Sequence, residues 1–234
     1  MALTRRRRQF ATVLIALGAT LIGSIVEWRL VRSAAASQPV RVPHDGIITS
    51  SGDQQAPERF EVHLETNKGV MAIEVRREWA PHGADRFYTL VEAGYYNDTR
   101  FFRVVAERWA QFGINGTPAV SQAWRNRTIP DDPRVLSNVK GTVAFAFAVP
   151  NGRTTQVFIN LQDNSPGHDT EPFAPFGRIT RGIEVIDQLN SEYGDTAGGG
   201  IRAGKQAPLF ERGNAYLDEH FPRLDRIVRA TVVQ

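Results

Sequence analysis

One arginine lies in the middle of an apolar stretch, where its charge requires an explanation. Residues 101–105 read FFRVV, so Arg103 is flanked on both sides by residues that favour a buried β-strand. A guanidinium stays protonated at physiological pH and is costly to remove from water without a partner. Arg103 therefore either packs its stem while its head reaches solvent, or projects into a cleft as a fixed cation. Only in the second case can it act on a substrate.

The segments that follow this arginine supply further polar residues among apolar ones. In chain order the informative blocks are FFRVV at 101–105, WAQFG at 109–113, GTVAFAFAVPNGRTTQVFI at 141–159 and PFAPFG at 172–177. Their order resembles the cyclophilin-type peptidyl-prolyl cis/trans isomerases, whose signature runs F-H-R-I-I, F-M-x-Q-G-G, G-x-x-x-M-A-N-A-x-P-N-x-x-x-S-Q-F-F-I and V-F-G. The spacing matches without a gap from Arg103 to Gln111 and from Gly141 to Phe158. Several separated blocks in the right order are more specific than any single block, and the resemblance covers residues 58–234.

The resemblance implies an activity and a set of site residues. The activity is faster rotation about X-Pro peptide bonds, whose barrier is about 20 kcal/mol because the nitrogen lone pair is delocalised into the carbonyl. Arg103 matches the family's catalytic arginine, which draws that lone pair out of conjugation. The positions that match substrate-binding residues are Gln111, Phe158, Trp109, Ala146, Phe147, Ala148, Gln156 and Phe173. The implied partners are proline-containing polypeptides.

The matched positions carry different implied roles. Gln111 corresponds to a glutamine that bonds the substrate backbone and helps to place the arginine, and Phe158 to the floor of the proline pocket. Ala146 and Ala148 correspond to small residues beside the peptide groove, and Gln156 to a glutamine on its rim. Trp109 replaces a methionine of the family pattern.

Other positions depart from that pattern. Arg108 stands where a pocket phenylalanine is common, and Phe147 where an asparagine bonds the substrate backbone. Residues 165–169 replace the usual aromatic-Leu-Asp-Gly stretch, and Phe173 or Pro172 stands where many members have histidine. These departures leave two alternatives to catalysis: a module or scaffold that holds proline-containing peptides, and a structural component of a membrane complex.

Several other chemistries find no support in the sequence. The five histidines show no metal-ligand spacing, the chain has no cysteine, and there is no G-x-S-x-G motif. The glycines at 198–200 are not followed by Lys-Ser or Lys-Thr, so they indicate a surface loop rather than a phosphate site. Residues 58–234 carry 21 basic and 22 acidic side chains, which gives no charge pattern for nucleic acid. We expect no metal, no cofactor and no nucleic-acid partner.

The hydrophobic pattern predicts a mainly β fold. Residues 59–66 and 69–76 alternate apolar and polar positions around an Asn-Lys-Gly turn, which indicates a hairpin. Helical periodicity appears at 81–93 and 182–189. Further strands are expected at 100–105, 109–114, 141–149, 156–161, 174–179 and 227–233. Strands with few intervening helices favour a closed antiparallel eight-stranded barrel capped by two helices, which is also the fold that the resemblance implies.

The N-terminal region differs from the rest of the chain. Arg5 to Arg8 form a cationic cluster, and seventeen uncharged residues follow, from Phe10 to Val26. This pattern predicts a signal-anchor helix with the domain on the extracytoplasmic side of a membrane, whereas cleavage near Ser37 would give a secreted or periplasmic protein. The predicted divisions are residues 1–33 for the arginine cluster and anchor, 34–57 for a linker, and 58–234 for a cyclophilin-like domain. We expect a monomer.

The C-terminal tail is longer than a barrel of this kind needs. Glycine-rich residues 194–204 lack apolar periodicity, so the sequence predicts a mobile or loosely attached surface loop. Residues 215–221 are expected to form a short helical turn. Residues 224–233 are expected to close the sheet beside the hairpin at 59–76.

Overall fold

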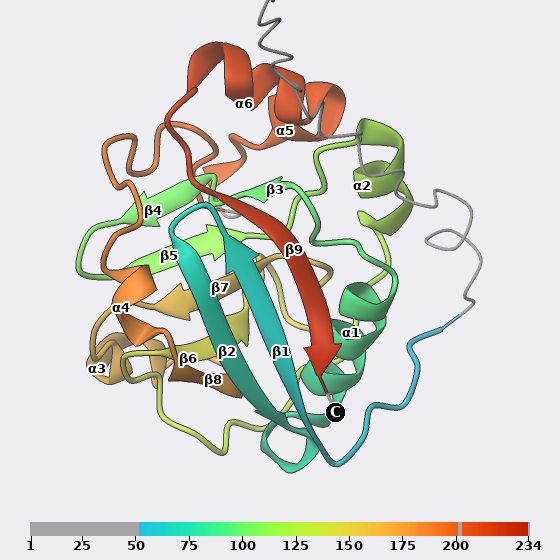
Figure 1. Cartoon of the computed structure of the whole chain (residues 1–234). Helices are drawn as coiled ribbons and strands as arrows, with labels where there is room; N and C mark the ends of the chain where they lie inside the picture. Colours follow the sequence, from blue (N-terminus) through green and yellow to red (C-terminus); the bar gives the residue numbers. More distant parts are fainter. Residues whose placement is uncertain (1–51, 201–202, 234) are drawn as a thin grey trace, which may run out of the picture. The chain divides into compact units, whose positions relative to one another are not determined.

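The computed structural model describes residues 52–200 and 203–233 (Figure 1). In this part of the chain a single antiparallel sheet has the strand order β3-β9-β1-β2-β8-β6-β7-β5-β4. Its strands are β1 (Arg59–Thr66), β2 (Gly69–Arg76), β3 (Thr99–Arg100), β4 (Arg103–Val105), β5 (Trp109–Phe112), β6 (Thr142–Phe145), β7 (Val157–Asn160), β8 (Pro175–Arg181) and β9 (Arg226–Val233). The helices are η1 (Arg77–Trp79), α1 (Pro81–Glu92), α2 (Pro118–Trp124), α3 (Ser165–His168), α4 (Ile183–Ile186), α5 (Ala207–Arg212) and α6 (Asn214–His220).

The first hairpin forms as its alternating pattern predicts. Strands β1 and β2 pair with Val62 opposite Ile73 and Leu64 opposite Met71, and all four side chains are fully buried. Alternate positions share one face of a strand, so a single register places the whole apolar set in the core. The last strand, β9, pairs with β1 and with β3, as expected for a strand that would otherwise leave its backbone groups unpaired.

The expected closed eight-stranded barrel is not confirmed. The sheet contains nine strands, and its end strands, β3 and β4, are not hydrogen-bonded to each other within the described residues. The chain passes between them through Phe101 and Phe102, whose rings are buried in two different apolar clusters. Strand pairing is therefore interrupted at Phe101 and Phe102, where the two rings pack into their clusters. The result is a mainly β, antiparallel sheet curved into an open half-barrel.

The helices are more numerous than the two that the sequence predicts. Helix α1 contacts β2, β8 and β9, whereas α5 and α6 lie together at the other end of the molecule, near α2 and β3 (Figure 1). The expected helix at 182–189 is present only as α4, and the turn expected at 215–221 is present as α6. The tail helices bury Leu209, Phe210 and Leu217 in a second apolar cluster with Phe102 and Ile114. The tail therefore packs on the rest of the domain through a second small core, which it shares with Phe102 and Ile114.

The glycine-rich segment of the tail is packed more closely than the sequence predicts. Ala197 is 2% exposed and joins the second cluster, and the next two glycines are also buried. A Cβ at Gly198 would stand 2.6 Å from the ring of Phe102, closer than side chains tolerate. Because Gly198 has no side chain, its backbone can lie against the Phe102 ring. The same lack of side chains leaves this segment without apolar periodicity in the sequence.

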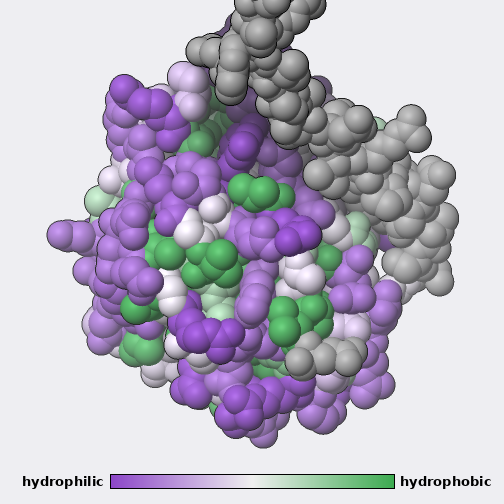
Figure 2. All heavy atoms as spheres, in the orientation of Figure 1, coloured by the Kyte–Doolittle hydropathy of each residue, from purple (hydrophilic) through white to green (hydrophobic). Residues whose placement is uncertain are grey.

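The structure leaves the predicted anchor untested. Residues 52–200 and 203–233 contain no helix that is both long enough and apolar enough to cross a membrane, and Phe10 to Val26 lie outside the described residues. On the face shown in Figure 2, apolar side chains occur as separate patches among polar ones. The most exposed large apolar residues are Val70, Val135, Val139, Val149, Ile183 and Val228.

Candidate active site

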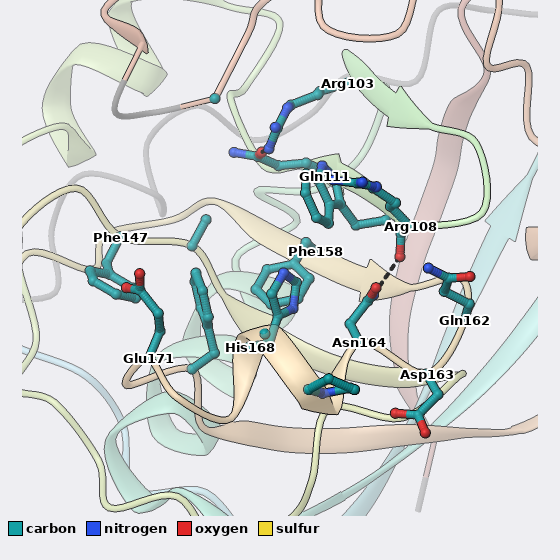
Figure 3. Close-up of a pocket in the computed structure, with 16 residues that line it drawn as sticks. Arg103, Arg108, Gln111, Phe147, Phe158, Gln162, Asp163, Asn164, His168 and Glu171 are labelled. Atoms are coloured by element: carbon teal, nitrogen blue, oxygen red, sulfur yellow. Dashed lines mark hydrogen bonds between the residues drawn. The ribbon is translucent and has the colours of Figure 1, made fainter.

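A pocket of about 660 Å³ opens beside strands β4 and β5 and is closed on its far side by the segment around α3 (Figure 3). Its lining residues are Arg103, Arg108, Trp109, Gln111, Ala146, Phe147, Phe158, Gln162, Asp163, Asn164, Pro166, Gly167, His168, Glu171, Phe173 and Gly200. No serine, threonine, cysteine, lysine or tyrosine is among these described residues. The pocket therefore offers aromatic walls and charged side chains, and its potential nucleophiles are the carboxylates of Asp163 and Glu171 and the imidazole of His168.

Arg103 is held at the edge of this pocket by three partners. Its position in β4 lies directly opposite Gln111 in β5, and its Nη1 donates a hydrogen bond to Gln111 Oε1 at 3.2 Å. Its Nε donates to the carboxylate of Asp195, and its guanidinium carbon lies 4.7 Å from the ring centroid of Trp109. The side chain is 18% exposed. Arginine suits this arrangement because its planar fork can bond several groups at once while keeping its charge.

The glutamines form a line behind the arginine. Gln111 Nε2 donates to Gln156 Oε1 at 2.8 Å, and both side chains are buried. Gln156 does not line the pocket; it lies behind Gln111 and supports it. Gln156, which the resemblance placed on the rim of the peptide groove, therefore supports a lining residue instead of lining the pocket itself.

The floor of the pocket is a group of aromatic rings. Phe158 makes edge contacts with Phe173 and His168, at centroid distances of 5.2 and 5.3 Å. Phe173 also contacts Phe147, at 4.8 Å, and Ala146 packs in the same cluster as Phe158. Rings in these orientations present an apolar, π-rich surface that suits a compact apolar ring such as that of proline.

His168 completes the floor, although the sequence analysis assigned its segment only to an altered loop. Its ring stacks on Trp109 at 5.2 Å and lies 4.8 Å from Phe173. Burial lowers the pKa of the His168 imidazole, so the ring is neutral near pH 7. The departure of residues 165–169 from the family pattern was the available signal, but it did not show that α3 would turn this ring inward.

Most of the predicted site residues come together. Arg103, Trp109, Gln111, Ala146, Phe147, Phe158 and Phe173 all line the pocket. Ala148, in contrast, is exposed and is not among the lining residues. Phe147 is backed by the buried Arg153, whose guanidinium carbon lies 4.7 Å from its ring centroid.

Arg108 also lines the pocket, with its guanidinium carbon 5.8 Å from the Trp109 ring centroid. Its backbone carbonyl accepts a 2.6 Å hydrogen bond from Asn164 Nδ2, which is the contact drawn in Figure 3. The two pocket arginines therefore differ. Arg103 bonds two side chains and is mostly buried, whereas Arg108 is exposed and lies farther from the centre of the same ring.

Two further residues at the site come from the tail and were missed by the sequence analysis. Asp195 bonds Arg103 across 92 positions of sequence, and Gly200 lies against the same guanidinium. A Cβ at Gly200 would stand 3.4 Å from the Arg103 guanidinium carbon. No local pattern marks such a pairing, because it depends on where the tail returns to the sheet.

Comparisons with known proteins agree with this fold and pocket. The family model described as "Cyclophilin type peptidyl-prolyl cis-trans isomerase/CLD" matches residues 61–207. The chain therefore belongs to the cyclophilin-type peptidyl-prolyl cis-trans isomerase family. The match ends at the start of α5, so α6 and β9 lie beyond it even though β9 is part of the sheet.

Individual relatives give the same result. The chain is 31% identical over 141 residues to a peptidyl-prolyl cis-trans isomerase of Acinetobacter baylyi, covering 57% of this chain and 75% of the relative. It is 32% identical over 136 residues to the peptidyl-prolyl cis-trans isomerase cyp18 of Streptomyces antibioticus, covering 55% and 81%.

Among solved structures, a cyclophilin type peptidyl-prolyl cis-trans isomerase of Cryptosporidium parvum superposes with a TM-score of 0.55 at 18% identity. That superposition covers 75% of this chain and 98% of the other. A second structure of that protein, crystallised in the presence of the dipeptide Ala-Pro, gives a TM-score of 0.53 at 19% identity, with 74% and 99% covered. At these identities the likeness concerns the fold.

Proposed function

We propose that the pocket binds a prolyl ring on its aromatic floor and that Arg103 accelerates rotation about the preceding X-Pro bond. The observation that carries this proposal is the fixed position of the guanidinium, held by Gln111 and Asp195 at the mouth of an apolar pocket. A donor directed at the prolyl nitrogen competes for its lone pair and weakens the partial double bond. The step requires no proton transfer and no covalent intermediate, so a fixed donor beside an apolar floor is sufficient for it.

A peptide isomerisation assay tests this function. Full-length protein is added at micromolar concentration to an X-Pro peptide, and the rate is followed by protease coupling or by NMR exchange. We expect acceleration by the wild-type protein and a loss of about 100-fold or more in kcat for Arg103→Ala, since removing one preorganised donor typically costs 10²–10³. Binding of the peptide without acceleration would instead support the proline-peptide-binding module, and no binding would support a structural role.

We further propose that the domain, residues 58–234, acts as a monomer tethered to the extracytoplasmic face of a membrane through Phe10 to Val26 and a linker at 34–57. The support is the arginine cluster before an uncharged run of seventeen residues. Full-length protein should sediment with membranes and resist carbonate extraction, and its domain should be digested only from the extracytoplasmic side. A mature protein that begins near Ser37 would show a cleaved signal, with the compartment retained and the anchor lost.

A further inference from the structure

A line of side-chain amides leads from Arg103 to the C-terminal tail. Arg103 Nη1 donates to Gln111 Oε1, Gln111 Nε2 donates to Gln156 Oε1, and Gln156 Nε2 donates to the Oε1 of Gln206 at 2.8 Å. Gln206 immediately precedes α5 and is 7% exposed. It is not among the residues that line the pocket. Gln206 can therefore act on the reaction only indirectly, through Gln156 or through Gly199, whose neighbour Gly200 lies against the Arg103 guanidinium.

The line has a direction that the arginine imposes. A guanidinium only donates hydrogen bonds, whereas an amide has one accepting oxygen and one donating NH₂. Gln111 must turn its oxygen toward Arg103, so its NH₂ faces Gln156. Gln156 must then offer its own oxygen to Gln111, and its NH₂ faces the tail. The correct orientation of both glutamines therefore requires an acceptor at position 206.

Gln206 meets that requirement and is itself oriented. Its Nε2 donates back to Gln156 Oε1 at 3.1 Å and lies 3.5 Å from the carbonyl oxygen of Gly199. The two amides thus form a reciprocal pair at the end of the line. Because Gln111, Gln156 and Gln206 are all buried, bulk water cannot replace a missing acceptor there without rearrangement.

Loss of the acceptor leaves the NH₂ of Gln156 without a partner, so that only the Arg103 contact then opposes the opposite orientation. Gln156 can then rotate its amide and present NH₂ to Gln111, which in turn presents NH₂ to Arg103. A donor would face the donating guanidinium, and the arginine would lose its hydrogen bond to Gln111. The aromatic floor would be unchanged, because none of its rings takes part in the line.

We propose that Gln206 is a positioning residue for the isomerisation, which fixes the orientation of the Gln156 and Gln111 amides and through them the aim of Arg103. This inference rests on the proposed function of Arg103. It assigns to the tail a part in the reaction that is separate from substrate contact.

The test compares three full-length variants. Gln206→Met removes the acceptor at similar size, and Gln206→Glu supplies an acceptor only. Gln122→Met is the matched control, because Gln122 Nε2 bonds the carbonyl of Phe210 in the same α5 region without any connection to Arg103. Each variant is assayed for kcat and KM on an X-Pro peptide, and its thermal unfolding is measured in parallel.

We expect Gln206→Met to lower kcat about tenfold with KM nearly unchanged, since one buried hydrogen-bond contact is worth about this much. Gln206→Glu should lower kcat less, because its carboxylate still accepts from Gln156 Nε2 although it no longer donates to Gln156 Oε1. Gln122→Met should leave kcat at the wild-type value. Equal losses in the Met and Glu variants, or a wild-type kcat in Gln206→Met, would overturn the proposal. A purely structural role of Gln206 would lower the unfolding temperature of Gln206→Met and Gln206→Glu, but not of Gln122→Met, without separating kcat from KM.

The side-chain ¹⁵N amide resonances of Gln111 and Gln156 distinguish this proposal from the proposed function. In Gln206→Met both resonances should shift while backbone resonances of the floor stay in place. If the wild-type protein does not accelerate the reaction at all, the proposed function fails, and unmoved Gln111 resonances would separately refute the orienting role of Gln206.

Discussion

Replacing Arg103 by lysine separates the charge of the guanidinium from its geometry. Lysine keeps the positive charge but has one nitrogen at the end of a flexible chain. In the structure the guanidinium bonds Gln111 through Nη1 and Asp195 through Nε, and lies over the Trp109 ring at 4.7 Å. A single ammonium group cannot keep these contacts and also direct a donor into the pocket.

The expected magnitude follows from these contacts. The buried bond to Gln111 is a charge-assisted one, worth about 1.5–3 kcal/mol. The bond to Asp195 counts for less, because that carboxylate is 62% exposed and solvent screens the pair. Loss of the first contact alone corresponds to about 10- to 100-fold in rate. We therefore expect Arg103→Lys to fall between the wild-type protein and Arg103→Ala.

The assay is kcat/KM for an X-Pro peptide, with Arg108→Lys as the matched control. Arg108 lines the same pocket and contacts the same tryptophan ring, but it is exposed. Its replacement by lysine should change the rate less than about twofold, since exposed contacts of this kind contribute little. The reasoning fails if Arg103→Lys equals the wild-type protein, because the fork would then be unnecessary. It fails equally if Arg103→Lys is as slow as Arg103→Ala, because the charge would then contribute nothing.

Three further outcomes are expected. Asp195→Asn should change kcat by less than about fivefold and weaken its dependence on salt, because the exposed ion pair is worth about 0–1 kcal/mol; a loss as large as that of Arg103→Ala would refute this. Burial lowers the pKa of His168 in the folded protein, so the unfolded chain takes up a proton first as the pH falls below about 6.5, and the free energy of unfolding decreases there. Thermal unfolding measured at pH 5 and at pH 7.5 should show this decrease, and the difference between the two pH values should be smaller in His168→Gln. Gly113→Ala should lower the free energy of unfolding, measured by urea titration, by at least about 2 kcal/mol, because Gly113 has a φ of +103° and an added Cβ would meet the carbonyl oxygen of Thr155. The control is Gly167→Ala, where a Cβ meets nothing within 4 Å, and its free energy of unfolding should stay close to the wild-type value.

Local signals were sufficient for the hairpin and for the main lining of the pocket. The alternation in β1 and β2 predicts both strands to their observed bounds, because side-chain direction in a strand depends only on position. The family resemblance implied that Gln111 helps to place Arg103, and the pairing of β4 with β5 sets these two positions opposite each other. Ala148 shows the limit of such matching, since a residue two positions from a lining alanine is exposed.

The number of strands and the open edge of the sheet could not be predicted from short-range sequence patterns. Phe101 and Phe102 read as part of one strand from 100 to 105, yet their rings serve two different clusters and the strand is interrupted there. Apolar residues in a row fit a buried strand and a crossing between two cores equally well, so the pattern alone does not distinguish them.

The alternation of residue types was enough to predict the hairpin, and the spaced motifs were enough to indicate the family, whose resemblance implied Arg103 and most of the aromatic residues of the pocket. Only the tertiary structure decided what surrounds that arginine. Asp195 and Gln206 reach the site from a tail whose glycines carry no periodic signal, and His168 enters the floor through the turn of α3. Contacts between segments so far apart depend on how the whole sheet curves and where the chain returns to it, and no local spacing records that geometry.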